Sequence, residues 1–208
     1  MPIKLNLSGF KATIELRDIS IYNYFYMHYV YYNLKGCNLM LSKRMIDAIN
    51  DQINYELLSS YLYLSMVAYC EDNDFHGAAN WYRIQAKEEV DHAMKFYNYL
   101  VEMNARVILK GFADPVTEFD GYKDTFEKSL AHEKTVTKRI YNLMDIAIEE
   151  KEHATVSFLK WYIDEQVEEE SNFNNILGKL KRADQNPAAL YMLDDELLAR
   201  VYTPIAAE

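Results

Sequence analysis

This 208-residue chain has few residues that interrupt helices, with only six glycines and four prolines. Glycine and proline are the poorest helix formers, so their scarcity favours long helices. Cysteine is also rare. The two cysteines, Cys37 and Cys70, lack the spacing of a metal site and are typical of a reducing compartment. We therefore expect a helical protein of the cytoplasm.

The chain also lacks an excess of positive charge and any long apolar run. Its formal net charge is −10, which argues against nucleic acid as a partner because phosphate binding needs a basic face. No apolar run reaches the roughly 18 residues of a membrane span, so we expect no membrane partner. Half of the residues are apolar, and the length suits one domain with a substantial core. The acidic balance suits a cation-handling protein, although many acidic proteins bind no cations.

Residues 1–39 differ from the rest of the chain. The Tyr-rich stretch 21–32 contains no acidic residue, and four Lys/Arg against two Asp/Glu give the segment a charge of +2. Tyrosines interrupt any apolar core, so the segment does not resemble a signal peptide. Its alternating pattern suits a strand, but a single strand would lack a partner. Two interpretations remain: an extension outside the domain, ordered or disordered, or an artefact of an upstream start codon.

Four long helical patterns and one short one follow Met40, where we expect the domain to begin. The break between the second and third helices has the length of a crossover that spans a four-helix bundle from end to end. The sequence therefore predicts an all-α fold, a four-helix bundle with a long crossover and a short fifth C-terminal helix. The expected helices run from a cap at Ser42 to residues 71–74, then over 76–103, 122–150 and 153–181, with a last one starting at Pro187.

Carboxylates fall on the apolar faces of the four long helices. Glu89 and His92 are three residues apart, so both project from one face of the second helix. A Glu-x-x-His pair alone is more often solvated than a metal ligand. An unpaired buried charge costs several kcal/mol, and yet the inward faces of the other three helices also carry charged or polar residues. These are Glu56, Glu133, Gln166 and Glu169.

Four carboxylates buried in one bundle would repel one another strongly. Two divalent cations would balance their charge. Oxygen ligands with one imidazole suit Fe(II), Mn(II) or, less selectively, Zn(II). The alternative is a set of salt bridges, but the inward faces offer no Lys or Arg to form them. We therefore favour a two-metal site.

From Met40 to about Tyr202, the chain resembles a non-haem bacterial ferritin. The similarity is carried by segments 54–60 (NYELLSS), 88–92 (EEVDH), 132–133 (HE) and 161–170 (WYIDEQVEEE). The resemblance implies a ferritin-like fold and a hollow homo-24-mer cage. It also implies a ferroxidase that oxidises Fe(II) to Fe(III) with O2 or H2O2 and stores the ferric mineral.

The resemblance further implies a di-iron centre, a third iron and a role for a nearby tyrosine. Tyr63 matches the family's tyrosine beside the centre, where it bonds a ligand or supplies an electron. The alternative is a packed core tyrosine with a satisfied hydroxyl. The implied ligands are Glu56, Glu89 and His92 for the first iron; Glu89 as a bridge, Glu133 and Glu169 for the second, with Gln166 beside it; and Glu88, Glu165, Glu168 and Glu169 for the third.

Two other classes stay open. A rubrerythrin-type peroxidase or another di-iron redox enzyme would carry a second Glu-x-x-His on the fourth helix, where this chain has Gln166-x-x-Glu169. A metal-free helical scaffold would have lost ligands, and none is lost. Val90 stands where bacterioferritins carry a haem-ligating methionine, so we expect no haem.

Two further expectations concern the surface. The fifth helix has an apolar stripe that is too apolar to face water, and by resemblance it packs around a four-fold axis. His132 and His153 are expected at the surface. The residues of the stripe are Leu190, Leu193, Leu197 and Val201.

Overall fold

The computed structural model describes residues 3–7, 10–14, 40–184 and 186–205, in two units that divide between Leu39 and Met40. In the first unit, β1 (Ile3–Leu7) and β2 (Phe10–Ile14) pair antiparallel. This pair was not expected from the sequence, and two segments so near in sequence can pair with each other. The Tyr-rich stretch 21–32 lies outside the described residues.

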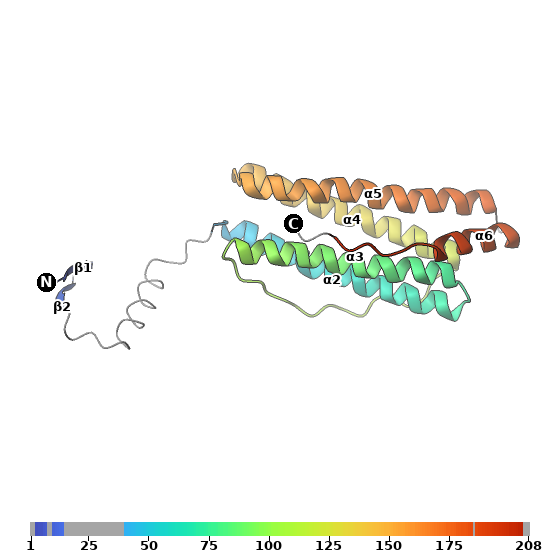
Figure 1. Cartoon of the computed structure of the whole chain (residues 1–208), viewed down its shortest axis with the longest axis horizontal. Helices are drawn as coiled ribbons and strands as arrows, with labels where there is room; N and C mark the ends of the chain where they lie inside the picture. The colour runs from blue at the N-terminus through green and yellow to red at the C-terminus, as the bar shows by residue number, and fades with distance from the viewer. Residues whose placement is uncertain (1–2, 8–9, 15–39, 185, 206–208) are drawn as a thin grey trace. The chain divides into compact units, whose positions relative to one another are not determined.

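The described part of the second unit is helical. α2 packs mainly on α3, and α4 on α5, as Figure 1 shows. The predicted bundle, its crossover and its short fifth helix are confirmed, with boundaries within one or two residues of those expected. No helix in the described residues is long and apolar enough to cross a membrane. The helices are α2 (Lys43–Asp72), α3 (His76–Glu102), α4 (Tyr122–Glu149), α5 (His153–Ala183) and α6 (Pro187–Leu198).

Side chains cap the helices where the sequence predicts. The Ser42 hydroxyl accepts the Met45 N–H at 3.0 Å at the start of α2, which satisfies one of the free N–H groups of the first turn. Pro187 opens α6, and the preceding Asn186 side chain accepts the N–H groups of Ala188 and Ala189. Local residue types therefore determine both helix starts.

The start of α3 is capped by α6 instead of by its own N-cap residue. The Asp194 carboxylate of α6 accepts the N–H groups of Gly77 at 2.8 Å and Ala78 at 2.9 Å. Leu193 and Leu197, on the same helix, are buried against the bundle. The short helix is thus attached to α3 by both an apolar and a polar contact.

The apolar stripe predicted for the fifth helix faces this chain's own bundle through Leu193 and Leu197. Including Val201 in that stripe was wrong, because the helix ends at Leu198 and Val201 is 81% exposed. The most exposed large apolar residues of α6 are Tyr191 and Met192, each 72% exposed.

The crossover between α3 and α4 has neither helix nor strand in its backbone, and two asparagines of α2 hold it in place. Asn50 donates to the Arg106 carbonyl at 3.1 Å and accepts the Ile108 N–H at 2.6 Å. Asn54 donates to the Ile108 carbonyl at 2.9 Å and accepts the Lys110 N–H at 2.6 Å. These paired bonds replace the strand partner that an extended segment would otherwise need.

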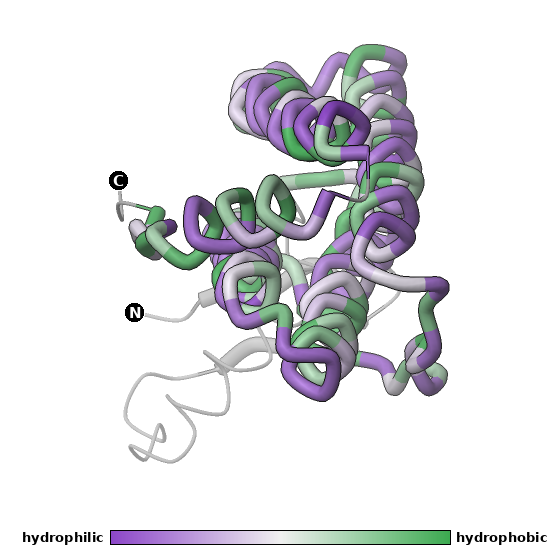
Figure 2. The backbone as a smooth tube through the Cα atoms, turned by 90° about the vertical axis from the view of Figure 1, so that its right-hand side faces the viewer, coloured by the Kyte–Doolittle hydropathy of each residue, from purple (hydrophilic) through white to green (hydrophobic). Residues whose placement is uncertain are grey.

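Two separate apolar clusters form the core. Figure 2 shows hydrophobic and hydrophilic residues alternating along each helix, as expected for amphipathic helices. One cluster contains Ile49, Phe96 and Ile140. The other contains Met66 and Phe126. On every long helix a polar layer separates the two clusters, and the predicted site residues fall in this layer.

Candidate metal centre

The polar layer contains one buried carboxylate from each of the four long helices. An imidazole, an amide and a phenol accompany them, and each of the seven side chains belongs to a residue no more than 3% exposed. Apolar clusters on both sides limit the access of water. These residues are Glu56 and Tyr63 of α2, Glu89 and His92 of α3, Glu133 of α4, and Gln166 and Glu169 of α5.

Glu56, Glu89 and His92 form the first group. One potential ligand atom from each lies within 4.8 Å of the other two, and His92 Nδ1 is 3.6 Å from Glu89 Oε2. Among the described residues, Glu56 Oε2 and Glu89 Oε2 have no hydrogen-bond partner. Buried oxygens of this kind are costly unless a cation or a donor meets them. The donor set of two carboxylates and one imidazole fits Fe(II).

Glu133 and Glu169 lie on the opposite pair of helices. Tyr63 donates its hydroxyl to Glu133 Oε1, and Gln166 Nε2 donates to Glu133 Oε2 at 3.1 Å. Glu169 Oε2 accepts a hydrogen bond from Gln85 Nε2 at 2.9 Å. Side-chain donors therefore fix both oxygens of Glu133 and one oxygen of Glu169.

The pKa values of the side chains in the centre reflect their burial away from water and the repulsion between neighbouring carboxylates. Burial raises the pKa of Glu89 to about 8 and that of Glu169 to about 7. Burial, followed by the charges of Glu89 and Glu169, raises the pKa of Glu133 well above its usual range. Burial lowers the pKa of His92, but the nearby carboxylates of Glu165 and Glu89 outweigh it and raise the pKa well above normal. Cation binding would therefore release protons from these groups.

Tyr63 is fully buried and stacks on Tyr82 and Phe173, with ring centroids 5.9 and 6.2 Å away. Burial, then the charge of Glu133, raises the pKa of Tyr63 well above its usual value. The phenol therefore remains protonated and can keep donating to Glu133. These contacts agree with a packed core tyrosine and with a tyrosine that bonds a ligand, since the ring is packed and the hydroxyl donates to the candidate ligand Glu133.

A second group of potential ligands joins His92 to Glu165 and Glu169, again within 4.8 Å of one another. His92 Nε2 lies 3.7 Å from Glu165 Oε1. Two of the four residues predicted for a third iron, Glu165 and Glu169, are thus close to each other and to the main centre.

The other two residues predicted for the third iron lie outside both groups. Glu88 Oε2 pairs with Arg200 Nη2 at 2.7 Å, in a contact that is about one-fifth exposed. Glu168 is exposed to solvent. An iron at this site would need Glu88 to exchange its arginine for the metal.

Two buried glutamines beside the centre were not predicted from the sequence. Gln52 Nε2 donates to Glu56 Oε1 at 2.8 Å, and Gln85 contacts Glu169 as described above. Both glutamines are no more than 1% exposed. The signal was present, because Gln52 precedes Glu56 by four residues and Gln85 precedes Glu89 by the same spacing.

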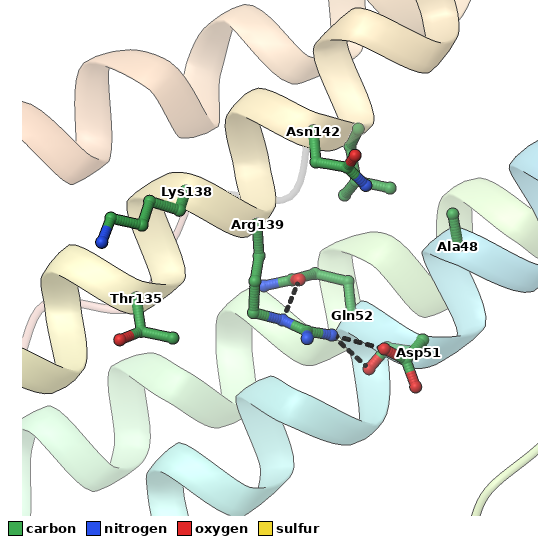
Figure 3. Close-up of a pocket in the computed structure, with 8 residues that line it drawn as sticks. Ala48, Asp51, Gln52, Thr135, Lys138, Arg139 and Asn142 are labelled. Atoms are coloured by element: carbon green, nitrogen blue, oxygen red, sulfur yellow. Dashed lines mark hydrogen bonds and ion pairs between the residues drawn. The ribbon is translucent and has the colours of Figure 1, made fainter.

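Among the described residues, no lysine or arginine forms a salt bridge with the four carboxylates, as expected from the inward faces. Two arginines instead approach the centre through the glutamines, and each pairs with a carboxylate outside it. Arg139 of α4 donates to Gln52 Oε1 at 2.9 Å and pairs with Asp51 at 2.7 Å. Figure 3 shows this contact in a pocket of about 240 Å³ between α2 and α4. Arg200 donates to Gln85 Oε1 at 2.5 Å.

His132 is half-buried, which corrects its expected place at the surface. Its ring stacks on Tyr55 with centroids 5.3 Å apart, and Nε2 lies 2.7 Å from the Ser59 hydroxyl. Burial, then the charge of Arg139, lowers the pKa of His132 to about 4, so it is neutral at pH 7. His153 is exposed, as expected.

Comparisons with known proteins agree with one another. A family model described as a ferritin-like domain matches residues 46–183. The chain is similar to bacterial non-heme ferritins of Staphylococcus saprophyticus, at 42% identity, and Staphylococcus haemolyticus, at 44%. Each match covers 78% of this chain and 98% of the relative.

Two solved structures of Archaeoglobus fulgidus ferritin are also similar. An engineered closed form is 44% identical with a TM-score of 0.77, and covers 78% of this chain and 99% of its own. A form described as an open-pore ferritin is 43% identical with a TM-score of 0.77. The match covers 77% of this chain and 99% of the ferritin chain.

Proposed function

The chain belongs to the ferritin family and is thus an iron-storing ferroxidase, and we propose that its buried polar layer is the di-iron ferroxidase centre. Iron is here the substrate, oxidised from Fe(II) to Fe(III) and then stored. The observation that carries the proposal is the pair of buried, unpartnered carboxylate oxygens on Glu56 and Glu89. Oxygens without a donor in a dry site are where a cation is most strongly favoured.

In this proposal, Glu56, Glu89 and His92 hold the first Fe(II). Glu89 also bridges to the second Fe(II), which Glu133 and Glu169 bind. Gln166, beside the second iron, and Tyr63 orient Glu133 by hydrogen bonds. The proposal is supported by the burial of the four carboxylates and by the proximity of the first three ligands.

Two Fe(II) ions held side by side can each give one electron to the same oxidant, so a two-electron step replaces two separate one-electron steps. Carboxylates bind Fe(III) more strongly than Fe(II) because the ion's charge is larger, and this favours oxidation. The oxidant, O2 or H2O2, is part of the proposal. The apolar clusters on both sides keep the reacting ions in a site of low dielectric.

This function is tested by adding Fe(II) to the protein under anaerobic conditions, then admitting O2 and measuring its consumption. The iron retained per particle is counted afterwards. A ferritin consumes the oxidant and keeps the iron. A di-iron redox enzyme of the rubrerythrin or peroxidase type turns over without storing it, and a metal-free scaffold does neither. Consumption without retained iron would therefore contradict the proposal.

We also propose that the chain assembles as a 24-subunit cage. The proposal is supported by family membership and by the adjacent large apolar side chains that α6 leaves most exposed, Tyr191 and Met192. Exposed apolar side chains that are adjacent in this way are typical of contact surfaces. Sedimentation velocity distinguishes a 24-mer from a dimer or a monomer directly.

A third iron is proposed beside the centre, at Glu165, Glu168 and Glu169, with Glu88 as a further ligand after it leaves Arg200. Glu165→Ala or Glu168→Ala should keep two-ion binding and the first oxidation burst. The number of Fe(II) oxidised per O2 and the rate of recovery after the burst should change, because the lost site accepts iron from the centre. Rapid-mixing absorbance with an oxygen electrode measures both quantities.

The matched control for the third site is Asp164→Ala, which removes an exposed carboxylate from the same turn of α5. If both glutamate variants keep the parent's stoichiometry and turnover, the third site has no role. The alternative is then correct, and Glu88, Glu165 and Glu168 are only part of an acidic surface.

Residues 1–39 are proposed to be dispensable for the ferritin domain, which starts at Met40. The division of the chain into units at this point and the start of the family match at residue 46 support the proposal. A chain that begins at Met40 should keep the particle size, melting temperature and oxidation rate of the full chain. Failure of the shortened chain to assemble, seen by sedimentation, would make the extension a structural element.

A further inference from the structure

Two glutamines beside the centre have their amide orientation fixed by arginines. A glutamine side chain can present either its oxygen or its nitrogen to a neighbour. An arginine only donates hydrogen bonds, so the glutamine atom next to it must be the oxygen. Arg139 Nε is 2.9 Å from Gln52 Oε1, and Arg200 Nη1 is 2.5 Å from Gln85 Oε1. The nitrogen of each amide is therefore directed toward the centre.

Each amide nitrogen then donates to one candidate ligand. Gln52 Nε2 lies 2.8 Å from Glu56 Oε1, and Gln85 Nε2 lies 2.9 Å from Glu169 Oε2. Glu56 keeps Oε2 without a partner among the described residues. The amide bond to one oxygen of Glu56 thus leaves the other oxygen available to a cation.

The two arginines are held in the same way. Arg139 Cζ lies 4.1 Å from the ring centroid of Tyr55, and Arg200 Cζ lies 3.8 Å from that of Trp81. Each guanidinium also pairs with a carboxylate at 2.7 Å, from Asp51 for Arg139 and from Glu88 for Arg200. An aromatic face and an acid together fix the guanidinium plane, so neither arginine turns to bind Glu56 or Glu169 itself.

We propose that Arg139–Gln52 and Arg200–Gln85 are two positioning relays of the ferroxidase centre. The first relay sets the orientation of Glu56 at the first iron, and the second sets that of Glu169 at the second iron. The inference rests on the proposed function, since it takes both glutamates to be ligands. Hydrogen bonds that orient metal ligands typically change affinity or activity by about 10–100-fold when they are lost.

The second relay depends on the segment 199–205, which we name the C-terminal strap. The strap runs along α3 after α6, as Figure 1 shows. Asn80 Nδ2 donates to the Arg200 carbonyl at 3.0 Å, and the Tyr202 hydroxyl donates to the Asp91 carboxylate. The chain thus reaches the second iron site from its C-terminal end, whereas the first relay lies within the bundle.

Cobalt(II) tests the relays, because it binds carboxylate and imidazole sites without being oxidised and its visible absorption reports its coordination. Titration of the full-length assembled protein gives the affinities of the first and second ion. Arg139→Leu should weaken the first Co(II) about 10–100-fold and spare the second. Arg200→Leu should weaken the second and spare the first. The Arg200 comparison is made in a Glu88→Gln background, so that a freed carboxylate does not bind Co(II) itself.

Double variants separate a relay from a general effect on structure. If Arg139 acts through Gln52, then Arg139→Leu should weaken Co(II) no further in a Gln52→Leu protein. The same holds for Arg200→Leu in Gln85→Leu. Arg139→Lys should restore part of the loss, because an ammonium can still donate to the glutamine oxygen but lacks the planar fork that also holds Asp51. This variant also keeps the test valid if the leucine variant does not fold.

Lys138→Leu is the control for charge, since Lys138 is exposed, lines the same pocket and contacts no glutamine. Unchanged Co(II) affinities in both arginine variants, equal losses at both ions, or additive double variants would each overturn the relays. An effect of Lys138→Leu as large as that of Arg139→Leu would do the same. If the parent protein binds no pair of Co(II) ions, the proposed di-iron centre fails, and the relays fail with it.

Discussion

Replacing Glu133 with alanine is expected to abolish fast Fe(II) oxidation while the helical bundle still folds. Glu133 is the one carboxylate that α4 supplies to the centre, and Tyr63 and Gln166 hold its two oxygens. Without it, the second Fe(II) loses a charged ligand, and the paired two-electron step loses its second ion. We expect the initial rate to fall by at least about 100-fold, the upper end of what a lost orienting contact costs. Stopped-flow absorbance of the ferric product measures this rate.

Glu89→Ala should be equally severe, because Glu89 is proposed to bridge both ions. The variant should still fold. Burial raises the pKa of Glu89 from 4.5 to about 8. The buried carboxyl therefore favours folding below pH 4.5, and the folded protein loses this stability as the pH rises from 4.5 through about 8. At pH 8 the alanine variant avoids that cost, which offsets part of the loss from the cavity it creates.

Glu127→Ala is the matched control for these variants. Glu127 lies on α4 six residues before Glu133, is exposed and pairs with Lys123. An exposed pair of this kind contributes little to stability. Parent-like oxidation in Glu127→Ala together with a large loss in Glu133→Ala would assign the effect to the centre. Parent-like oxidation in Glu133→Ala and Glu89→Ala would show that the ions bind elsewhere.

The helices could be predicted because their signals are local. Ser42 and Pro187 mark two starts, and the apolar spacing of three and four marks each inward face. The buried carboxylates could be found because they interrupt that spacing, as Glu133 does between Phe126 and Ile140. These properties belong to one helix at a time, so no knowledge of the packing was needed.

Contacts that join distant parts of the chain could not be predicted. Arg200 lies 115 residues beyond Gln85, and nothing in either residue's neighbourhood specifies the other. Glu88 was predicted as a ligand of the third iron, but the arginine that it meets was not expected. The stripe of α6 was extended to Val201 because periodicity alone does not show where a helix stops.

Gly77→Ala is expected to detach α6 from the bundle. A Cβ atom at this position would lie 1.7 Å from the Asp194 carbonyl oxygen and 2.5 Å from its carbon. Both atoms belong to the backbone, so the helix itself must move. Burial of Leu193 and Leu197 is worth about 1.5–3 kcal/mol each, and the Asp194 cap adds about 1 kcal/mol. Losing all three should lower the melting temperature by on the order of 10–20 °C, measured by calorimetry.

Gly178→Ala separates the contact at Gly77 from any general effect of replacing a helical glycine. At Gly178 the added Cβ would meet only the Arg182 Nη1 atom, at an ordinary 3.7 Å. Glycine weakens a helix interior by about 0.5–1 kcal/mol relative to alanine, so this variant should be slightly more stable than the parent. Opposite shifts in the two variants would support the docking of α6 on α3. A Gly77→Ala protein that melts at the parent's temperature would mean that α6 contributes nothing to the bundle and that Asp194 is not needed as the cap of α3.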